Sequence, residues 1–207
     1  MASERHEFYQ QLTNKVLRAG KPLVLGGRMG AGKTAVGSRI ALKLNLPFVD
    51  SDREIEESAQ MQVSDIFATY GEKEFRRLEK RVIMRILENP EQIISTGGGV
   101  LTTAESRAAI QSRAISLWLR VESSEILNRI LRKNNRPLLQ TENPAEIIEK
   151  LLGERQPYYA AADLTIDSQP SAEETCDYLL DRLDLYLSRA DSPLVSAAHN
   201  RVSNHEG

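Results

Sequence analysis

The stretch that decides the fold is Gly27-Arg28-Met29-Gly30-Ala31-Gly32-Lys33-Thr34. It fits the phosphate-loop pattern G-x-x-x-x-G-K-S/T, and it stands between an apolar run at 22–27 and a helical pattern at 34–44, the context that this motif requires. Glycines allow backbone N–H groups to converge on phosphate oxygens, and the positive end of the following helix reinforces them. Lys33 can reach the β- and γ-phosphates, and the Thr34 hydroxyl can bind Mg²⁺. The stretch therefore predicts a nucleoside triphosphate site; the alternative is a glycine-rich strand–helix turn without a ligand.

The rest of the chain repeats this alternation of apolar runs and helical patterns. Further apolar runs lie at 47–50, 92–96, 114–121 and 163–167. They lack a clean apolar–polar alternation, which is typical of strands buried on both faces of a parallel sheet. Helical periodicity recurs at 72–87, 123–131, 144–152 and 172–187. The sequence therefore predicts an α/β fold, with a doubly wound, five-stranded parallel sheet between two layers of helices.

Length and composition limit what the chain can be. With 207 residues it fits one domain, which we place at 21–188. Residues 1–20 are predicted to form an added amphipathic helix with Phe8, Leu12 and Val16 on one side. From Arg189 onward the periodicity is lost, so 189–207 are predicted to be a disordered tail.

Charge and cysteine content exclude several classes of protein. Lys and Arg total 27 against 29 for Asp and Glu, a net charge of −2 that argues against a partner such as nucleic acid or an anionic membrane. The single Cys176 excludes a disulfide framework and a thiolate zinc site. The mean hydropathy is −0.39, and no apolar run is long enough for a signal peptide or a membrane span. We expect a soluble, cytoplasmic protein.

Two further strand ends carry residues suited to phosphoryl transfer. Asp50 and Asp52 end the second run, where ligands collect in a parallel sheet. One carboxylate can hold Mg²⁺, and the other can orient a substrate hydroxyl, although a helix N-cap competes for Asp52. The third run ends in Gly97-Gly98-Gly99, where a compact polar ligand can approach the backbone; a flexible turn is the alternative.

Six segments in order carry a family resemblance: GGRMGAGKT at 26–34, FVDSD at 48–52, GEKEFRRLE at 71–79, TGGGV at 96–100, RPLL at 136–139 and ERQPYY at 154–159. Together they resemble the shikimate kinases. The resemblance implies a phosphate-loop kinase fold with a mobile lid at about 132–145. It also implies Mg²⁺-dependent transfer of the γ-phosphate of ATP to the 3-hydroxyl of shikimate, a step of the chorismate pathway.

The resemblance also implies roles for individual residues. ATP phosphates would be held by Gly30, Ala31, Gly32, Lys33, Thr34 and Ala35, with Arg136 in the lid. Thr34 and Asp50 would bind Mg²⁺, and the catalytic residues would be Asp52, Lys33 and Arg136. The shikimate site would be formed by Asp52, Arg76, Gly97, Gly98, Gly99 and Arg155. Arg129 is a rough match to an adenine-stacking residue.

Some features leave alternatives open. Without the resemblance, the sequence favours a solvent-exposed helix face with many charged side chains, which would include Arg76 and Glu79. Gln60 stands where the family commonly has Gly, which would shift that helix turn, and 167–170 match the adenine-contacting region too loosely to assign. A gluconate-type kinase and a nucleotide-binding regulatory module are the other functions considered. We expect a monomer whose ligands are ATP and shikimate.

Overall fold

The computed structural model describes residues 2–122, 124–126 and 156–190. The helices are α1 (Ala2–Ala19), α2 (Lys33–Leu44), α3 (Ser51–Ala59), α4 (Val63–Ile86), α5 (Ala104–Arg113) and α8 (Ala172–Ala190), with a 3₁₀ turn η1 (Val100–Thr102). The strands are β1 (Leu23–Gly26), β2 (Phe48–Asp50), β3 (Ile93–Ser95), β4 (Ile115–Arg120) and β5 (Leu164–Asp167). Two further helical segments lie at 124–126 and 156–160. Within the described ranges, no helix is long and apolar enough to cross a membrane.

The strands form one parallel sheet in the order β2-β3-β1-β4-β5. Leu23 of β1 pairs with Ile93 of β3 on one side and with Ile115 of β4 on the other. From the central β1 the chain passes to the edge strand β2, returns to β3 beside β1, and then crosses to β4 and β5 on the other side, so the connections change direction beside the phosphate loop. Ligands in open α/β sheets bind at such a point, at the carboxyl ends of the strands. The predicted five-stranded, doubly wound sheet is confirmed.

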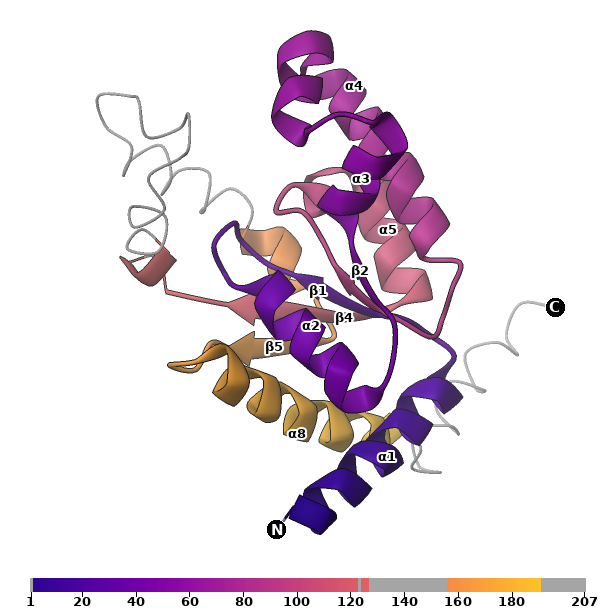
Figure 1. The fold of residues 1–207 in the computed structure, drawn as a ribbon, viewed down its shortest axis with the longest axis vertical. Coiled ribbons are helices and arrows are strands. Elements are labelled where there is room, and N and C mark those ends of the chain that lie inside the picture. Colours follow the sequence, from indigo (N-terminus) through magenta and orange to yellow (C-terminus); the bar gives the residue numbers. More distant parts are fainter. Residues whose placement is uncertain (1, 123, 127–155, 191–207) are drawn as a thin grey trace, which may run out of the picture.

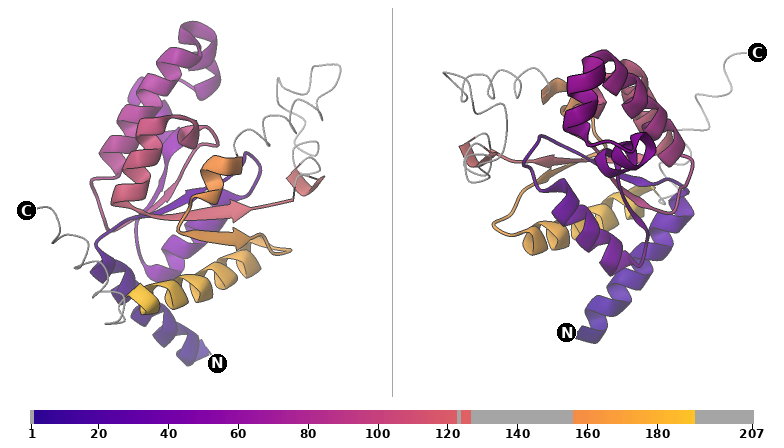
Figure 2. Two further views of the ribbon diagram at one scale, coloured as in Figure 1. Left: turned by 180° about the vertical axis from the view of Figure 1, so that it is seen from behind. Right: turned by 45° about the horizontal axis from the view of Figure 1, so that its top comes forward.

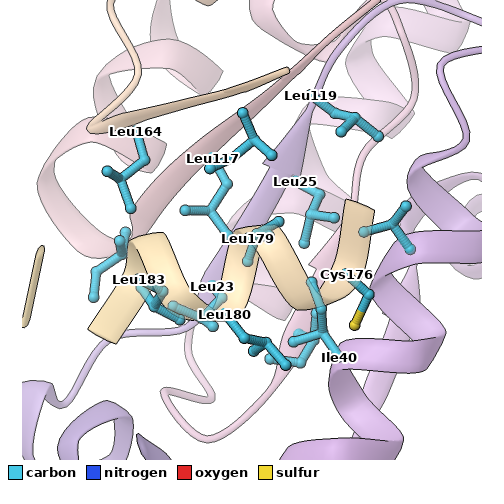
Figure 3. Packing of buried hydrophobic residues seen from close by; sticks show 14 of the residues in the cluster. Leu23, Leu25, Ile40, Leu117, Leu119, Leu164, Cys176, Leu179, Leu180 and Leu183 are labelled. Carbon is cyan, nitrogen blue, oxygen red and sulfur yellow. The ribbon is translucent and has the colours of Figure 1, made fainter. Parts of the chain in front are cut away.

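Helices cover both faces of the sheet, as Figures 1 and 2 show. On one face α1, α2 and α8 pack against alternate side chains of the strands, including Leu23, Leu25 and Leu117. Figure 3 shows how the apolar face of α8, with Cys176 and Leu179, lies against β1 and β4. On the other face Val24 and Ile94 meet α3, α4 and α5. Burial of the strands on both faces explains why their sequences lack alternation.

The predicted N-terminal helix is α1, and it is docked on the domain (Figure 1). Leu12 and Val16 are buried in the same core as α2 and α8, with 0% and 1% of their surface exposed. Ion pairs surround this contact: Arg5 lies 3.2 Å from Asp177, and Lys15 lies 2.6 Å from Asp184. The helix is therefore part of the folded domain rather than a separate appendage.

The helical periodicity at 72–87 corresponds to the second half of α4. Gly71 interrupts this helix with φ 76° and ψ 174°, so the regular helix restarts close to the predicted position. By contrast, α5 was not predicted, because its sequence AESRAAIQSR has few large apolar residues to mark a buried face. The predicted helices at 123–131 and 144–152 fall mostly or wholly outside the described residues, as do the predicted lid and residues 191–207 of the tail.

Gln60 ends α3 in the left-handed conformation, with φ 52° and ψ 34°. This conformation is strained for a residue that has a Cβ atom, whereas glycine adopts it without that strain. The Gln60 backbone N–H donates to the Glu56 carbonyl, and its side chain donates to the Glu57 carbonyl at 2.8 Å. The helix turn therefore keeps the conformation that glycine would adopt. Having Gln60 in place of glycine does not shift the turn but strains the backbone at this residue.

Candidate active site

The phosphate loop joins β1 to α2 at the carboxyl edge of the sheet. Gly30 and Gly32 have φ values of 82° and 91°, a conformation that residues with a side chain rarely adopt. These turns curl the backbone around the N-terminus of α2. Lys33 is buried, and its ammonium donates to the carbonyls of Gly27 at 2.8 Å and Arg28 at 2.9 Å. A phosphate entering the loop would offer this ammonium a charged acceptor in place of the two carbonyls.

The end of β2 brings two oxygen ligands next to the loop. The Thr34 hydroxyl donates to Asp50 Oδ2 at 2.8 Å. The other carboxylate oxygen, Oδ1, accepts from the Asp52 backbone N–H at 3.1 Å, so Asp50 is the N-cap of α3. The capping role that sequence reasoning weighed for Asp52 thus belongs to Asp50, while Asp52 sits in the first helical turn. A hydroxyl and a carboxylate are hard oxygen donors that suit Mg²⁺.

No cluster of three or more His, Cys, Asp or Glu side chains suited to a metal occurs among the described residues. Mg²⁺ in nucleotide kinases needs few protein ligands, because water and phosphate oxygens complete its shell. The pair formed by Thr34 and Asp50 therefore fits this ion when it arrives with a nucleotide.

Asp52 lies in the first turn of α3, beside Asp50 and against the glycine triplet. It retains access to solvent, but the surrounding protein desolvates its carboxylate, and this burial raises its pKa. The nearby charges of Asp50 and Glu56 raise the pKa further, while Lys33 and Arg76 lower it. A carboxylate held in this way binds a proton more readily than one in water, which suits a group that accepts a proton from a hydroxyl.

Arg76 projects from α4 toward the same crevice. Its guanidinium donates to Glu79 at 2.8 Å and to Glu72 at 3.2 Å. Burial alone would lower the pKa of Arg76, but the hydrogen bonds to these two glutamates outweigh it and raise the pKa. Glu79 is buried, with 1% of its surface exposed. The solvent-exposed, charged helix face considered from the sequence is therefore wrong as a description of Glu79. It does describe Arg77, whose side chain is 67% exposed and pairs with Glu74.

The glycine triplet after β3 lies against each of these groups. A Cβ atom at Gly97 would approach the Asp52 carboxylate within 3.0 Å, and one at Gly99 would do the same to the Arg76 guanidinium. A Cβ at Gly98 would lie 3.2 Å from the backbone nitrogen of Met29 in the phosphate loop. The glycines are needed here for close approach, since neither the Gly97 nor the Gly99 φ is positive. The triplet is thus a packed wall of the crevice.

The structure brings together most of the residues that the sequence predicted for the site. The phosphate loop at 30–35, Asp50, Asp52, Arg76 and the triplet at 97–99 meet at one edge of the sheet. Arg136, Arg155 and Arg129 lie outside the described residues, so their predicted roles stay predictions.

Two contributors to the crevice were not singled out from the sequence. Ser51 is fully buried, and its hydroxyl accepts a hydrogen bond from the Gly97 N–H at 2.9 Å. Tyr159 is 2% exposed, and its hydroxyl donates to the Gly98 carbonyl at 2.6 Å. Both side chains fix the glycine triplet. In the sequence, nothing marked these two residues except that they lie within the DSD and ERQPYY segments.

The family profile and the curated relatives point to one family. The family profile described as shikimate kinase matches residues 29–184. A shikimate kinase of Mesorhizobium japonicum is 46% identical over 154 residues, which cover 74% of this chain and 76% of that protein. A shikimate kinase of Bartonella henselae is 44% identical over 173 residues, covering 83% of this chain and 82% of the relative.

Solved structures agree. The shikimate kinase from Acinetobacter baumannii in complex with shikimate superposes with a TM-score of 0.76 at 36% identity, covering 83% of this chain and 96% of that chain. A gluconokinase from Sinorhizobium meliloti reaches a TM-score of 0.50 at 15% identity, with 87% of this chain and 97% of that chain covered. At that identity the likeness to the gluconokinase concerns the fold alone.

Proposed function

Since this chain belongs to the shikimate kinase family, we propose that it transfers the γ-phosphoryl group of ATP to the 3-hydroxyl of shikimate. The products are shikimate 3-phosphate and ADP, which places the enzyme in aromatic amino-acid biosynthesis. The observation that carries this proposal is the meeting of a carboxylate suited to orienting a hydroxyl, Asp52, and a half-buried guanidinium, Arg76, beside one phosphate loop. That set matches an acceptor that carries both a hydroxyl and a carboxylate.

The phosphate loop holds the donor. Backbone N–H groups of residues 30–35 and the N-terminus of α2 face the ATP phosphates, and Lys33 moves from the Gly27 and Arg28 carbonyls to a phosphate oxygen. Thr34 and Asp50 hold Mg²⁺, directly or through water. An ion held there by Thr34 and Asp50 would supply positive charge against the phosphates. The lid residue Arg136 is proposed to supply further positive charge and to help to exclude water.

Asp52 is the proposed orienting group and general base. Its carboxylate accepts a hydrogen bond from the 3-hydroxyl of shikimate and takes the proton as the oxygen bonds to the γ-phosphorus. The bond between the γ-phosphorus and its bridging oxygen breaks, and the electron pair leaves with ADP. Burial and the charge of Asp50 raise the pKa of Asp52, so it holds this proton more readily than an exposed carboxylate does.

Arg76 is the proposed partner of the shikimate carboxylate, joined by Arg155. A planar guanidinium can meet both oxygens of a carboxylate, which Lys cannot do. Glu79 and Glu72 already hold the Arg76 side chain in place, so little conformational freedom is lost on binding. The triplet at 97–99 is proposed to line the ring of the substrate. Cytoplasmic location and a monomeric state stay predictions.

The function is tested by an assay that couples ADP release to a visible readout, with shikimate, gluconate and nucleoside monophosphates offered separately. We expect turnover with shikimate alone. Turnover with gluconate would favour a gluconate-type kinase, and ATP binding without stimulated turnover would favour a regulatory module.

Individual roles are tested by substitution in the same assay. Lys33→Met should abolish turnover. Arg76→Ala should raise KM for shikimate by about 10- to 100-fold, as expected for loss of a charged hydrogen-bonding partner. Its matched control is Arg77→Ala on the solvent side of the same helix turn, which should leave that KM unchanged. An unchanged KM for shikimate in Arg76→Ala would contradict the carboxylate assignment.

A further inference from the structure

The helical segment at 156–160 packs directly behind the glycine triplet. Tyr159 is almost completely buried, and its ring stacks on Trp118 of β4 with the centroids 6.1 Å apart and the planes at 18°. This packing leaves the hydroxyl aimed at the Gly98 carbonyl, to which it donates at 2.6 Å. The two residues are 61 positions apart in the sequence, so the contact joins two separate segments of the fold.

The bond to Gly98 determines how the next N–H group is presented. The peptide between Gly98 and Gly99 is planar and trans, so its carbonyl and its N–H point in opposite directions. With the carbonyl turned toward Tyr159, the Gly99 N–H must point away from segment 156–160. No acceptor among the described residues takes this N–H. Gly99 also adjoins the Arg76 guanidinium, so this peptide lies close to the proposed partner of the substrate carboxylate.

Neighbouring contacts hold the same loop from its other end. The Thr102 hydroxyl donates to the Gly99 carbonyl at 2.6 Å, and Arg107 donates to the Leu101 and Thr102 carbonyls at 2.7 and 2.9 Å. The Arg107 guanidinium lies over the Tyr158 ring, 4.2 Å from its centroid. Tyr158 thus contacts Arg107, which holds the end of the loop, whereas Tyr159 bonds the triplet itself.

We propose that Tyr159 is a positioning residue of the acceptor site: its hydroxyl fixes the Gly98–Gly99 peptide so that the Gly99 N–H is presented to the bound substrate. This inference rests on the proposed role of the triplet in binding shikimate. The proposed donor site is the phosphate loop, whereas the Tyr159 hydroxyl bonds to the glycine triplet beside Arg76. Loss of the hydroxyl is therefore expected to raise KM for shikimate and to leave KM for ATP unchanged.

The test compares two single-atom deletions on adjacent residues of the full-length enzyme. Tyr159→Phe keeps the ring stacked on Trp118 and removes the bond to Gly98. Tyr158→Phe is the matched control, because the Tyr158 side chain is 38% exposed and its ring, rather than its hydroxyl, makes the contact with Arg107. Steady-state constants for shikimate and for ATP are measured for both variants, together with their thermal unfolding midpoints.

Tyr159→Phe is expected to raise KM for shikimate by about five- to tenfold, the effect of losing one positioning hydrogen bond, with KM for ATP unchanged. Tyr158→Phe should match the parent protein in both constants. A purely structural role would lower the unfolding temperature of Tyr159→Phe without separating the two KM values, and that outcome would overturn the proposal. Equal increases in both KM values would overturn it as well.

The result also separates this inference from the proposed function. If Arg76→Ala weakens shikimate binding and Tyr159→Phe does not, the acceptor site stands and only the role of Tyr159 is wrong. If neither variant changes KM for shikimate while turnover with shikimate persists, the assignment of Arg76 and the glycine triplet to the shikimate site is wrong. If shikimate does not support turnover in the parent enzyme, the proposed function itself fails.

Discussion

Asp52 illustrates a residue whose chemistry works against the stability of the fold. Burial and the neighbouring carboxylate of Asp50 make the ionised form costly, and Lys33 and Arg76 offset only part of that cost. The pKa of Asp52 in the folded protein consequently lies above its ordinary value of 3.8. Ionised Asp52 therefore destabilises the folded state at neutral pH, which is typical of a functional carboxylate.

This yields a prediction for Asp52→Asn. The variant should lose about 100-fold or more in kcat, because the group that accepts the proton is gone. It should also unfold at a higher temperature than the parent at pH 7. A raised carboxylate pKa means that the folded state binds the proton more tightly, so the penalty is present above the folded pKa and disappears below 3.8. Thermal melts from pH 7 to pH 3.5 check this: the advantage should shrink as the pH falls, and a constant advantage would contradict the stated cause.

At the scale of secondary-structure elements, α1 stabilises the fold by burying apolar side chains, whereas the end of α3 carries backbone strain. The N-terminal helix buries Leu12 and Val16 in a core shared with α2 and α8. Lys43 of α2 adds a polar link, since it lies 2.6 Å from Asp177, the same carboxylate that Arg5 and Tyr9 contact. Burial alone would lower the pKa of Lys43, but its hydrogen bonds to Asp177 and Glu173 raise it. The end of α3, in contrast, carries strain at Gln60.

For α1, Leu12→Ala should destabilise the protein by about 2 to 5 kcal/mol, because it removes a fully buried side chain and leaves a cavity. Leu17→Ala on the same helix is the control; Leu17 is 37% exposed, so its loss should cost under about 1 kcal/mol. Urea unfolding measures both free energies. Because α1 lies away from the crevice, kcat and both KM values should stay unchanged below the unfolding transition. Equal losses in the two variants would show that α1 is not packed as described.

For α3, Gln60→Gly should stabilise the protein by about 0.5 kcal/mol. Relief of the left-handed strain, about 1 kcal/mol or more, outweighs the greater freedom of glycine in the unfolded chain. Gln60→Ala retains the strain while losing the side-chain bond to Glu57, so it should not stabilise. The difference in urea midpoint between the two variants is the measurement, and a more stable Gln60→Ala would argue against backbone strain as the cause.

On the scale of the whole molecule, the sheet joins the two proposed ligand sites, which are built from different helices. The donor site belongs to the loop between β1 and α2, while Arg76 comes from α4 on the opposite face. They meet at the carboxyl edge, where the triplet after β3 touches both the phosphate loop and Arg76. We therefore predict that the proposed acceptor site can be disabled without loss of nucleotide binding.

Ligand-induced stabilisation tests that separation. At 100 times Kd a ligand stabilises the folded protein by about 2.7 kcal/mol, which corresponds to a rise of about 5 to 10 °C in Tm for a chain of this size. In the parent protein both shikimate and ADP with Mg²⁺ should produce such a rise. Arg76→Ala should lose most of the shikimate effect at the same concentration and keep the nucleotide effect. Loss of both effects would show that the two sites are not independent.

The fold and the donor site were largely predictable because their signals are local. Each strand appears in the sequence as an apolar run, and the phosphate loop is one continuous segment. The residues that line the acceptor site were named through the family resemblance. The structure places Asp52, Arg76 and the triplet at 97–99 side by side.

The contacts that support the site could not be predicted, because they depend on distances that no local pattern records. Glu79 looked like a surface charge, yet it is buried against Arg76. Asp50, rather than Asp52, caps α3, since the chain leaves β2 directly into that helix. Ser51 and Tyr159 reach the triplet across 46 and 61 residues of sequence.

By itself, the sequence determined the alternation of strands and helices and the placing of phosphate-binding chemistry after the first strand, since both follow from patterns within a few neighbouring residues. The tertiary structure alone decided which side chains hold the acceptor wall in place. Hydrogen bonds such as the one from Tyr159 to Gly98 exist only after the sheet and its helices have packed, because packing is what brings such distant residues within 3 Å of each other.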